Sequence, residues 1–413
     1  MNRLYDILIV GGGIVGCSLA KELGRRFDRV LVLEKENGVA FHTSGRNSGV
    51  IHSGFNQKPG TLKAQLCVDG NRQTRAYCKE RQIPCEEVGT YVVATREEEL
   101  PSLHQLKAKG DKNGVPGIEI LSIEEVRRRE PNVKGLAALF SPTGAIVDSV
   151  KFAQALRDDA ERLGVGFGFG EEVMHIKERK DEVKVSTNRW TYQAQLLINC
   201  AGLHADRLAH LMKVGREYMI NPFRGEYFVV GGKSVSIINS MIYPVPNPEF
   251  PFLGVHLTKT IAGSILIGPN AVPAFGREAY SKWSFNLKDF SQMIFHRGLW
   301  KALRTNRLLR EVAWSELKNS CSKKHFLKEA SRLVDGLRLE DLTLAKRVGI
   351  RAQLIRSDGQ FQDDLVVETT RRSIHLLNVV SPGMTSALPF AQWLSKGIAD
   401  GLYWRYPRQE AAA

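Results

Sequence analysis

The chain of 413 residues is poor in cysteine and contains no long hydrophobic run. Its six cysteines show no CxxC spacing, which argues against a zinc site and a disulfide framework and favours a reducing compartment. No stretch reaches the roughly 20 uninterrupted apolar residues that a membrane-spanning helix requires. The first strand is expected about four residues in, which leaves no room for a signal or transit peptide. We therefore predict a cytoplasmic protein without a bound metal ion.

Positive charge, by contrast, is in excess, with 58 Lys and Arg against 44 Asp and Glu and a formal net charge of +14. Half of the surplus lies between Lys288 and Arg347. Two interpretations are open: a solvated helical face, or a peripheral contact with the inner face of the cell membrane, where each basic residue contributes about 1 kcal/mol. A nucleic-acid partner is not predicted, because no RNA-binding motif accompanies the charge and the spacing of Trp283, Trp300 and Trp314 is typical of core packing.

The N-terminal 34 residues have the pattern of a βαβ unit. An apolar run from Asp6 to Val10 predicts a strand, and a helix is expected from Cys17 to roughly Phe27. Arg29 to Leu33 predicts a second buried strand, which ends at Glu34. A composition of 43% hydrophobic and 25% charged residues is that of a globular enzyme, and the length favours two intertwined domains.

The turn of this unit is rich in glycine. Gly11 permits a tight turn, Gly13 lets the backbone approach a pyrophosphate, and Gly16 lets the helix pack closely on the strand. The N-terminus of the helix offers free N–H groups and a partial positive charge to phosphates. Glu34 follows Gly13 by about 20 residues, where a carboxylate can accept hydrogen bonds from ribose hydroxyls. The unit therefore predicts a bound dinucleotide.

Two later segments favour FAD over NAD. The apolar run Leu196–Gly202 ends in small residues that would let a late strand approach the dinucleotide. The turn Val380–Gly383 precedes a helix, and its N–H groups could face the pyrimidine end of a flavin and stabilise the negative charge of the reduced ring. A nicotinamide enzyme has no obvious need for such a C-terminal return to the first domain.

Six further motifs carry a family resemblance. They are HTSGRNSGVIHSG (His42–Gly54), KPGTLKAQLC (Lys58–Cys67), NPFRGEYF (Asn221–Phe228), YPVPNPEFPFLGVHLT (Tyr243–Thr258), IGPNAV (Ile267–Val272) and GIRAQ (Gly349–Gln353). With them the chain resembles the L-2-hydroxyglutarate dehydrogenase/oxidase family of the D-amino-acid-oxidase-type FAD-dependent oxidoreductases. The resemblance covers nearly the whole chain, and its middle motifs are specific to this family rather than to FAD proteins at large.

The resemblance implies non-covalently bound FAD and oxidation of L-2-hydroxyglutarate to 2-oxoglutarate, by hydride transfer from C2 to flavin N5. The electrons would pass to a membrane quinone or to oxygen. Alternatives are the oxidation of another small anionic substrate, namely an amino acid, glycerol phosphate or another 2-hydroxy acid. The implied cofactor-binding residues are Gly11, Gly13, Gly16, Glu34, Lys35, Thr43, Ser44, Arg46, Asn47, Ser48, Gly49, Val173, Ala201, Gly202, Arg351, Pro382, Gly383, Met384 and Thr385.

Several positions depart from the family pattern. Arg46 stands where the family usually has His, and Asn56 and Gln57 stand where aromatic residues are common. Lys346-Arg347-Val348 replaces a Pro-Ala type lead into GIRAQ, and Gly383-Met384 replaces an Ala-Ala pair. The last two departures fall where the family closes over flavin and substrate, so they bear on substrate preference.

Oxidation of a 2-hydroxy acid requires a base for the hydroxyl proton, and a neutral histidine is suited to that task near neutral pH. His52 lies in the predicted flavin-contacting loop and His256 in the predicted substrate-side β region. The sequence offers no means of choosing between them. The plainer interpretation of each is a structural hydrogen bond.

A dicarboxylate also needs two anion sites, and arginine suits them because its planar fork grips a carboxylate with two hydrogen bonds. Arg224 and Arg351 lie in apolar or β surroundings where an unpaired charge would be costly. Their alternative is a buried ion pair with Glu226 or a neighbouring acid. Tyr243 could orient the substrate or simply pack as an aromatic residue.

The predicted fold class is α/β, α+β overall. A Rossmann-like FAD-binding domain is formed by residues 1–85, 145–220 and 345–405, and a discontinuous, mainly antiparallel β-sheet substrate domain by 86–144 and 221–344, including a basic helical segment 288–344. Helices are also expected at 62–81, 149–164 and 383–403, a hairpin at 171–186, and strands at 89–95, 196–202 and 373–380. The sequence leaves the oligomeric state open.

Overall fold

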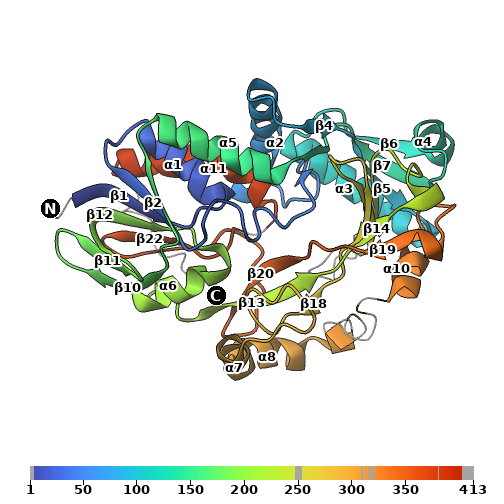
Figure 1. Cartoon of the computed structure of the whole chain (residues 1–413). Coiled ribbons are helices and arrows are strands. Elements are labelled where there is room, and N and C mark those ends of the chain that lie inside the picture. The colour runs from blue at the N-terminus through green and yellow to red at the C-terminus, as the bar shows by residue number, and fades with distance from the viewer. Residues whose placement is uncertain are drawn as a thin grey trace.

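Two large β-sheets lie at opposite ends of the molecule, and a long pair of strands runs between them (Figure 1). The structure is a computed structural model that describes residues 4–246, 254–307, 310–311, 313–314, 316, 320, 322–379 and 381–401. The middle of the predicted Tyr243–Thr258 motif, residues 247–253, and Val380 of the predicted flavin turn lie outside the described residues.

The first sheet contains the predicted βαβ unit. Its central strands β1, β2, β9, β12 and β22 pair in parallel, and β10, β11 and β21 add antiparallel edges. The order along the sheet is β10 (Val173–Glu178), β11 (Val183–Thr187), β12 (Thr191–Asn199), β1 (Leu4–Val10), β2 (Val30–Glu34) and β9 (Gly166–Phe169), while β22 (Ser373–Leu376) pairs with β12 and β21 (Val367–Thr369) with β22. The apolar runs of β1 and β2 follow from burial on both faces of a parallel sheet.

The second sheet is antiparallel apart from one parallel pair, β15 with β5. Its order is β19 (Leu342–Leu344), β14 (Phe228–Val230), β17 (Ile265–Gly268), β16 (His256–Lys259), β15 (Met241–Pro244), β5 (Thr90–Ala94), β7 (Ala137–Ser141) and β6 (Glu119–Ser122). Its core contains fully buried aromatic residues, among them Tyr91 and Phe228. The mixed α/β fold class is thereby confirmed.

Two small sheets complete the strands. The longer pair, β13 (Tyr218–Gly225) with β20 (Gly349–Arg356), crosses the middle of the molecule and is joined by β18 (Val272–Pro273). The other small sheet contains β3 (Val50–Ile51), β8 (Ala145–Val147) and β4 (Cys85–Glu87). All strands of the first large sheet fall within 1–85, 145–220 and 345–405, and all strands of the second within 86–144 and 221–344. The domain boundaries themselves stay a prediction.

Ten α-helices are assigned in the described residues. They are α1 (Ile14–Gly24), α2 (Leu62–Glu80), α3 (Leu100–Asn113), α4 (Ile123–Arg129), α5 (Ser149–Arg162), α6 (Ala205–Leu211), α7 (Leu287–Phe295), α8 (Arg297–Thr305), α10 (Lys323–Ala330) and α11 (Gly383–Ala399). Helix α11 packs against α1 and α2 on one face of the first sheet, where Leu19, Phe390 and Ile398 share one core (Figure 1). The C-terminal helix therefore returns to the N-terminal unit. None of the described helices is long and apolar enough to cross a membrane.

Most predicted elements are present with shifted ends, but two predictions are wrong. The basic segment is not helical up to Leu344, because a 3-10 turn (Leu339–Asp341) leads into strand β19, which pairs with β14 and buries Leu342. The predicted core packing of the tryptophans also fails, since Trp283 is 83% and Trp300 45% exposed.

Candidate functional site

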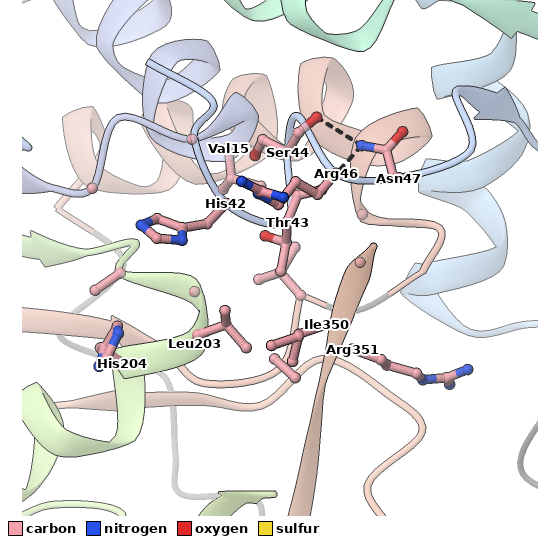
Figure 2. A pocket seen from close by; sticks show the side chains of 18 of the residues that line it. Val15, His42, Thr43, Ser44, Arg46, Asn47, Leu203, His204, Ile350 and Arg351 are labelled. Atoms are coloured by element: carbon pink, nitrogen blue, oxygen red, sulfur yellow. Dashed lines mark hydrogen bonds between the residues drawn. The ribbon is translucent and has the colours of Figure 1, made fainter. Parts of the chain in front are cut away.

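A cavity of about 800 Å³ runs along the carboxyl ends of β1 and β2 and is bordered by the long strands β13 and β20. Its walls come from the start of the chain, from the turns after β9 and β12, from the second sheet, and from β20 and the N-terminus of α11. Figure 2 shows residues 42–47 along one side, with Leu203, His204, Ile350 and Arg351 opposite. Ligands of α/β sheets bind at such carboxyl ends.

The three predicted glycines make the first wall. Gly11 has a φ of +110°, and a Cβ there would lie 2.5 Å from the carbonyl oxygen of Cys200. A Cβ on Gly13 would lie 2.9 Å from Oγ of Ser44. Gly16 does not line the cavity; its Cβ would lie 1.9 Å from the carbonyl oxygen of Gly11, so it lets α1 pack on the turn. The backbone thus forms a cradle that side chains would fill, which fits a dinucleotide.

Glu34 stands where a ribose-binding carboxylate is expected. Its two oxygens accept hydrogen bonds from the backbone N–H of Gly12 (2.6 Å) and of Glu36 (2.9 Å), and these bonds hold the carboxylate at the cavity wall. Val173, at the start of β10, and Ala201 and Gly202, after β12, line the same cavity.

The loop after Ala40 forms a second wall through internal hydrogen bonds. Oγ of Ser44 accepts from the N–H of Ile14 at 2.9 Å, so the loop reaches the N-terminus of α1. The Asn47 amide donates to the carbonyls of Thr43 (3.0 Å) and Ser44 (2.7 Å), as Figure 2 shows. Thr43, Ser44, Arg46, Asn47 and Ser48 all line the cavity. Gly49 does not; with a φ of +73° it lies against the carbonyl of Val147 and turns the chain into β3.

The C-terminal turn forms a third wall. Pro382, Gly383, Met384 and Thr385 line the cavity at the beginning of α11. Oγ1 of Thr385 accepts a hydrogen bond from the backbone N–H of His52 at 3.0 Å. The first and last segments of the chain therefore meet at this wall.

Both candidate bases line the cavity and both are neutral at pH 7. Burial, followed by the charge of nearby Lys63, lowers the pKa of His52 to about 4. Burial lowers the pKa of His256 to about 4 as well, against the opposing effect of its bond to Gly254. Nδ1 of His256 lies 2.9 Å from the Gly254 carbonyl oxygen, which can only accept, so Nδ1 carries the proton and Nε2 keeps its lone pair. Nε2 of His52 lies 3.3 Å from Oγ of Ser381.

Tyr243 packs against His256 with 4.3 Å between the ring centres, and it also lines the cavity. Burial raises its pKa above the usual range, so the phenol stays protonated and can donate a hydrogen bond. Tyr227, which directly precedes β14 of the same sheet, lines the cavity too, and burial raises its pKa to about 12. Tyr227 lies within the NPFRGEYF motif but was not predicted to be a site residue.

The two candidate arginines separate. Phe223 pairs with Arg351 and Arg224 pairs with Ile350 across β13 and β20, so the pleat turns Arg351 and Arg224 to opposite faces. Arg351 lines the cavity. Arg224 does not: its guanidinium bonds to Glu226 (2.9 Å) and to the Ser281 carbonyl (3.2 Å), with both charged groups buried. The structure therefore favours the ion-pair alternative for Arg224 and does not bring it to the substrate side.

Lys63 is a cation near this site that the sequence reasoning missed. It lies in the first turn of α2, where a positive charge opposes the helix dipole, and burial lowers its pKa while Asp363 partly restores it. Burial also lowers the pKa of Arg351. In the described part of the chain, no carboxylate lies within 4 Å of the Lys63 ammonium, which donates to the carbonyl of Asp363. A signal was present, since Lys at the second helical position is unfavourable.

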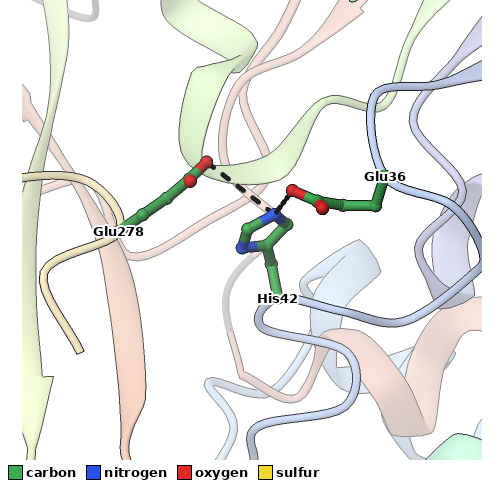
Figure 3. Close-up of side chains that lie close together, drawn as sticks. All are labelled: Glu36, His42 and Glu278. Atoms are coloured by element: carbon green, nitrogen blue, oxygen red, sulfur yellow. Dashed lines mark hydrogen bonds and ion pairs between the residues drawn. The ribbon is translucent and has the colours of Figure 1, made fainter. Parts of the chain in front are cut away.

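A polar cluster closes the cavity beside Lys35. Nε2 of His42 lies 2.9 Å from a carboxylate oxygen of Glu36 and 3.7 Å from one of Glu278, between the two acids in Figure 3. His204 lies 2.8 Å from Glu278, and this hydrogen bond above all lowers the pKa of Glu278 to about 2. The three residues of Figure 3 could offer metal ligands, but the Lys35 ammonium contacts both carboxylates and already supplies a cation.

Nearly the whole chain matches one protein family. Residues 6–396 match the model of the family described as FAD dependent oxidoreductase. The chain belongs to the FAD-dependent oxidoreductase family. The three walls described above are therefore those of a family whose members use FAD, and the predicted cofactor is confirmed.

Curated relatives narrow the position within the FAD-dependent oxidoreductases. The chain is 40% identical over 389 residues to the L-2-hydroxyglutarate dehydrogenase of Escherichia coli K12, covering 94% of this chain and 91% of the relative. It is 35% identical over 421 residues to the mitochondrial L-2-hydroxyglutarate dehydrogenase of Homo sapiens, covering 97% and 89%. The resemblance drawn from the sequence motifs is thereby confirmed.

Solved structures of FAD-dependent oxidoreductases share the fold. L-alpha-glycerophosphate oxidase from Mycoplasma pneumoniae, solved with FAD bound, superposes with a TM-score of 0.76 at 25% identity, covering 96% of this chain and 95% of the other. Glycine oxidase from Geobacillus kaustophilus superposes with a TM-score of 0.73 at 20% identity, covering 97% and 95%.

Proposed function

We propose that this FAD-dependent oxidoreductase oxidises L-2-hydroxyglutarate to 2-oxoglutarate. One observation carries the proposal: two neutral histidines, two tyrosines and Arg351 line one cavity with the dinucleotide glycines, in a chain 35–40% identical to L-2-hydroxyglutarate dehydrogenases over nearly its whole length.

The backbone around Gly11 and Gly13 and the first N–H groups of α1 would hold the pyrophosphate of a non-covalently bound FAD. Glu34 would accept hydrogen bonds from the ribose, and the loop 43–48 and the turn 382–385 would flank the flavin. When bound, FAD supplies an acceptor for the C2 hydrogen and its two electrons.

His256 is the proposed base. Its Nδ1 proton is fixed by the Gly254 carbonyl, so Nε2 can take the proton of the substrate hydroxyl. Burial lowers the pKa of His256 and keeps its ring neutral. An anionic substrate beside the ring would raise this pKa and stabilise the protonated ring that forms when His256 takes the proton. His52 has the alternative role of orienting the substrate together with Ser381.

Arg351 and Lys63 suit the two carboxylates of the substrate. The charge of Lys63 acts on His52 and that of Arg351 acts on Lys63, and burial disfavours the charged forms of both cations, so an arriving dianion would stabilise both charges. Arg351 can bind one carboxylate through two hydrogen bonds, whereas Lys63 acts as a point charge. A small dicarboxylate is therefore the substrate class that fits this end of the cavity.

The electron acceptor is proposed to be a membrane quinone, with oxygen as the alternative. The positive charge of the basic segment supports a peripheral membrane contact, and such a contact would place the protein near a membrane quinone. A second candidate activity is the oxidation of glycerol phosphate, because the same cations would bind a phosphate and the fold matches an L-alpha-glycerophosphate oxidase at 25% identity.

Anaerobic reduction of the bound flavin tests the proposal. Fast bleaching of the flavin absorbance by L-2-hydroxyglutarate is expected, with at most weak bleaching by L-lactate and none by the D form or by L-glycerol phosphate. Equal or faster bleaching by glycerol phosphate would favour the second candidate. Protein that binds FAD and is bleached by none of these compounds would overturn the assignment.

A further inference from the structure

An apolar face is exposed in the basic segment. The side chains of Trp283, Leu287 and Phe295 are 83%, 73% and 82% exposed, although such residues are usually buried. Phe285 and Ile294 are exposed beside them. We refer to these five residues and Trp300 as the α7 face.

The α7 face is continuous. Leu287, Ile294 and Phe295 are seven and eight residues apart on α7, so they lie on one side of the helix. The indole N–H of Trp300, on α8, donates to the carbonyl of Ile294, which brings the start of α8 beside the end of α7. Figure 1 shows α7 and α8 together at the edge of the molecule below β13 and β18.

The rest of α7 is held to the protein. Lys288 and Gln292 line the cavity, Met293 is buried, and Asp289 forms an ion pair with Arg207. The helix is therefore anchored by one side, while the α7 face stays largely exposed, apart from a ring contact between Phe285 and Phe290. Anchored helices with exposed aromatic and aliphatic residues are typical of interfacial membrane binding.

Charge identifies the partner. Between Lys282 and Glu311 seven Lys or Arg stand against two Asp or Glu. Both acids are already paired, Asp289 with Arg207 and Glu311 with Arg307. A surface with exposed apolar side chains, in a segment with a surplus of basic residues, complements anionic phospholipid headgroups over an acyl layer. A second copy would bring the same positive charge, so self-association is disfavoured.

We propose that the α7 face docks the protein onto an anionic phospholipid bilayer, with the aromatic and aliphatic side chains entering the interface and the surrounding lysines and arginines contacting the headgroups. The inference assigns residues to the membrane contact of the proposed function. The docking does not depend on the substrate. Since Lys288 and Gln292 line the cavity from the same helix, docking would hold that side of the cavity next to the membrane.

Vesicle sedimentation of the FAD-loaded protein tests the docking. Binding is expected to vesicles of phosphatidylcholine with about a quarter phosphatidylglycerol, to weaken with salt, and to be much weaker with phosphatidylcholine alone. The triple variant Trp283→Ser, Leu287→Ser, Phe295→Ser and the double variant Lys301→Glu, Arg304→Glu should each lower the bound fraction at least tenfold.

Matched controls lie elsewhere on the surface. Trp190→Ser removes a tryptophan that is 66% exposed on the first sheet, and Lys109→Glu with Lys112→Glu reverses two exposed lysines on α3. These controls should bind like the parent protein. Equal losses in the controls, or no vesicle binding by the parent protein, would overturn the docking, as would concentration-dependent dimerisation through the α7 face or retention by single-stranded RNA without retention by vesicles.

Turnover with a soluble dye as electron acceptor separates this inference from the proposed function. The docking variants should keep the dye-linked oxidation of L-2-hydroxyglutarate at the parent rate. A parent protein that binds vesicles but does not oxidise the substrate would contradict the proposed function alone. One that turns over but ignores vesicles would contradict the docking alone.

Discussion

One carboxylate oxygen of Glu278 lies 2.8 Å from Nε2 of His204, and the same oxygen forms an ion pair with Lys35. His204 and Lys35 line the cavity, whereas Glu278 belongs to the segment between β18 and α7. The neighbouring Arg277 forms a buried ion pair with Asp206. This segment is therefore fastened across the cavity by charged contacts to residues of the FAD-binding side.

We expect Glu278→Gln to release FAD about tenfold faster than the parent protein. The change removes charge-assisted hydrogen bonds, each of which contributes about 1.5–3 kcal/mol, and tenfold corresponds to about 1.4 kcal/mol. The rise of free-flavin fluorescence after dilution measures the rate. Glu98→Gln, at an exposed glutamate far along the chain, is the control. An unchanged rate in Glu278→Gln would show that the segment does not retain the cofactor.

We expect Arg224→Met to lower stability rather than substrate affinity. The substitution leaves the buried carboxylate of Glu226 without its guanidinium, and breaking a buried pair from one side costs about 3–5 kcal/mol. Denaturant unfolding of the FAD-loaded protein measures the loss. The KM of the folded variant should stay within about twofold of the parent value, and a large rise in KM with unchanged stability would return Arg224 to the substrate site.

We expect Arg351→Ala to raise the KM for L-2-hydroxyglutarate about 10–100-fold, because a charge-assisted pair with a carboxylate contributes about 1.5–3 kcal/mol. If Arg351 binds the remote carboxylate, weak turnover of L-lactate, which lacks that group, should change little. Steady-state kinetics with both substrates, using a dye acceptor, separate the two cases. A fall in kcat with an unchanged KM would instead place Arg351 at the reacting centre.

We expect the ring of His256 to titrate near pH 4 rather than near 6.5. Burial favours the neutral ring, so the folded state binds fewer protons than the unfolded state between these pH values, and stability falls as the pH drops through this window. Histidine ring resonances followed by NMR give the pKa, and His256→Asn identifies the signal. Titration of that signal near 6.5 would contradict the expected pKa. Full activity of His256→Asn would contradict the role of His256 as the base.

The N-terminal unit could be predicted from sequence because its signals are local. Gly11, Gly13 and Gly16 each serve one steric need, and Glu34 follows from the length of one helix and one strand. The loop 43–49 was reached through a family motif and the C-terminal turn through its position before a helix, and nearly all of their selected residues line the cavity. Gly49 is the exception, since its role is in the backbone of its own turn.

Arg224 shows what single-residue reasoning omits. Alternation along β13 places neighbouring residues on opposite faces, and the side of the cavity is known only once β20 is paired with it in register. The prediction that the tryptophans of the basic segment pack in the core was wrong for a related reason. Helical spacing tells which residues share a face but not whether anything covers that face. Tyr227 was missed although it lines the cavity beside the second sheet, and Lys63 was missed because it acts on His52 through its charge, from helix α2.

The arrangement of α11 constrains how the protein is made in the cell. Strand β22 covers the end of β12, and α11 fills the space between α1 and α2 while its first residues complete the cavity wall. On the ribosome, more than 300 residues must therefore be synthesised after the glycine turn before α11 is complete at Ala399. Until that point the growing polypeptide has no finished place for flavin, so loading of the cofactor belongs to the last stage of its biogenesis.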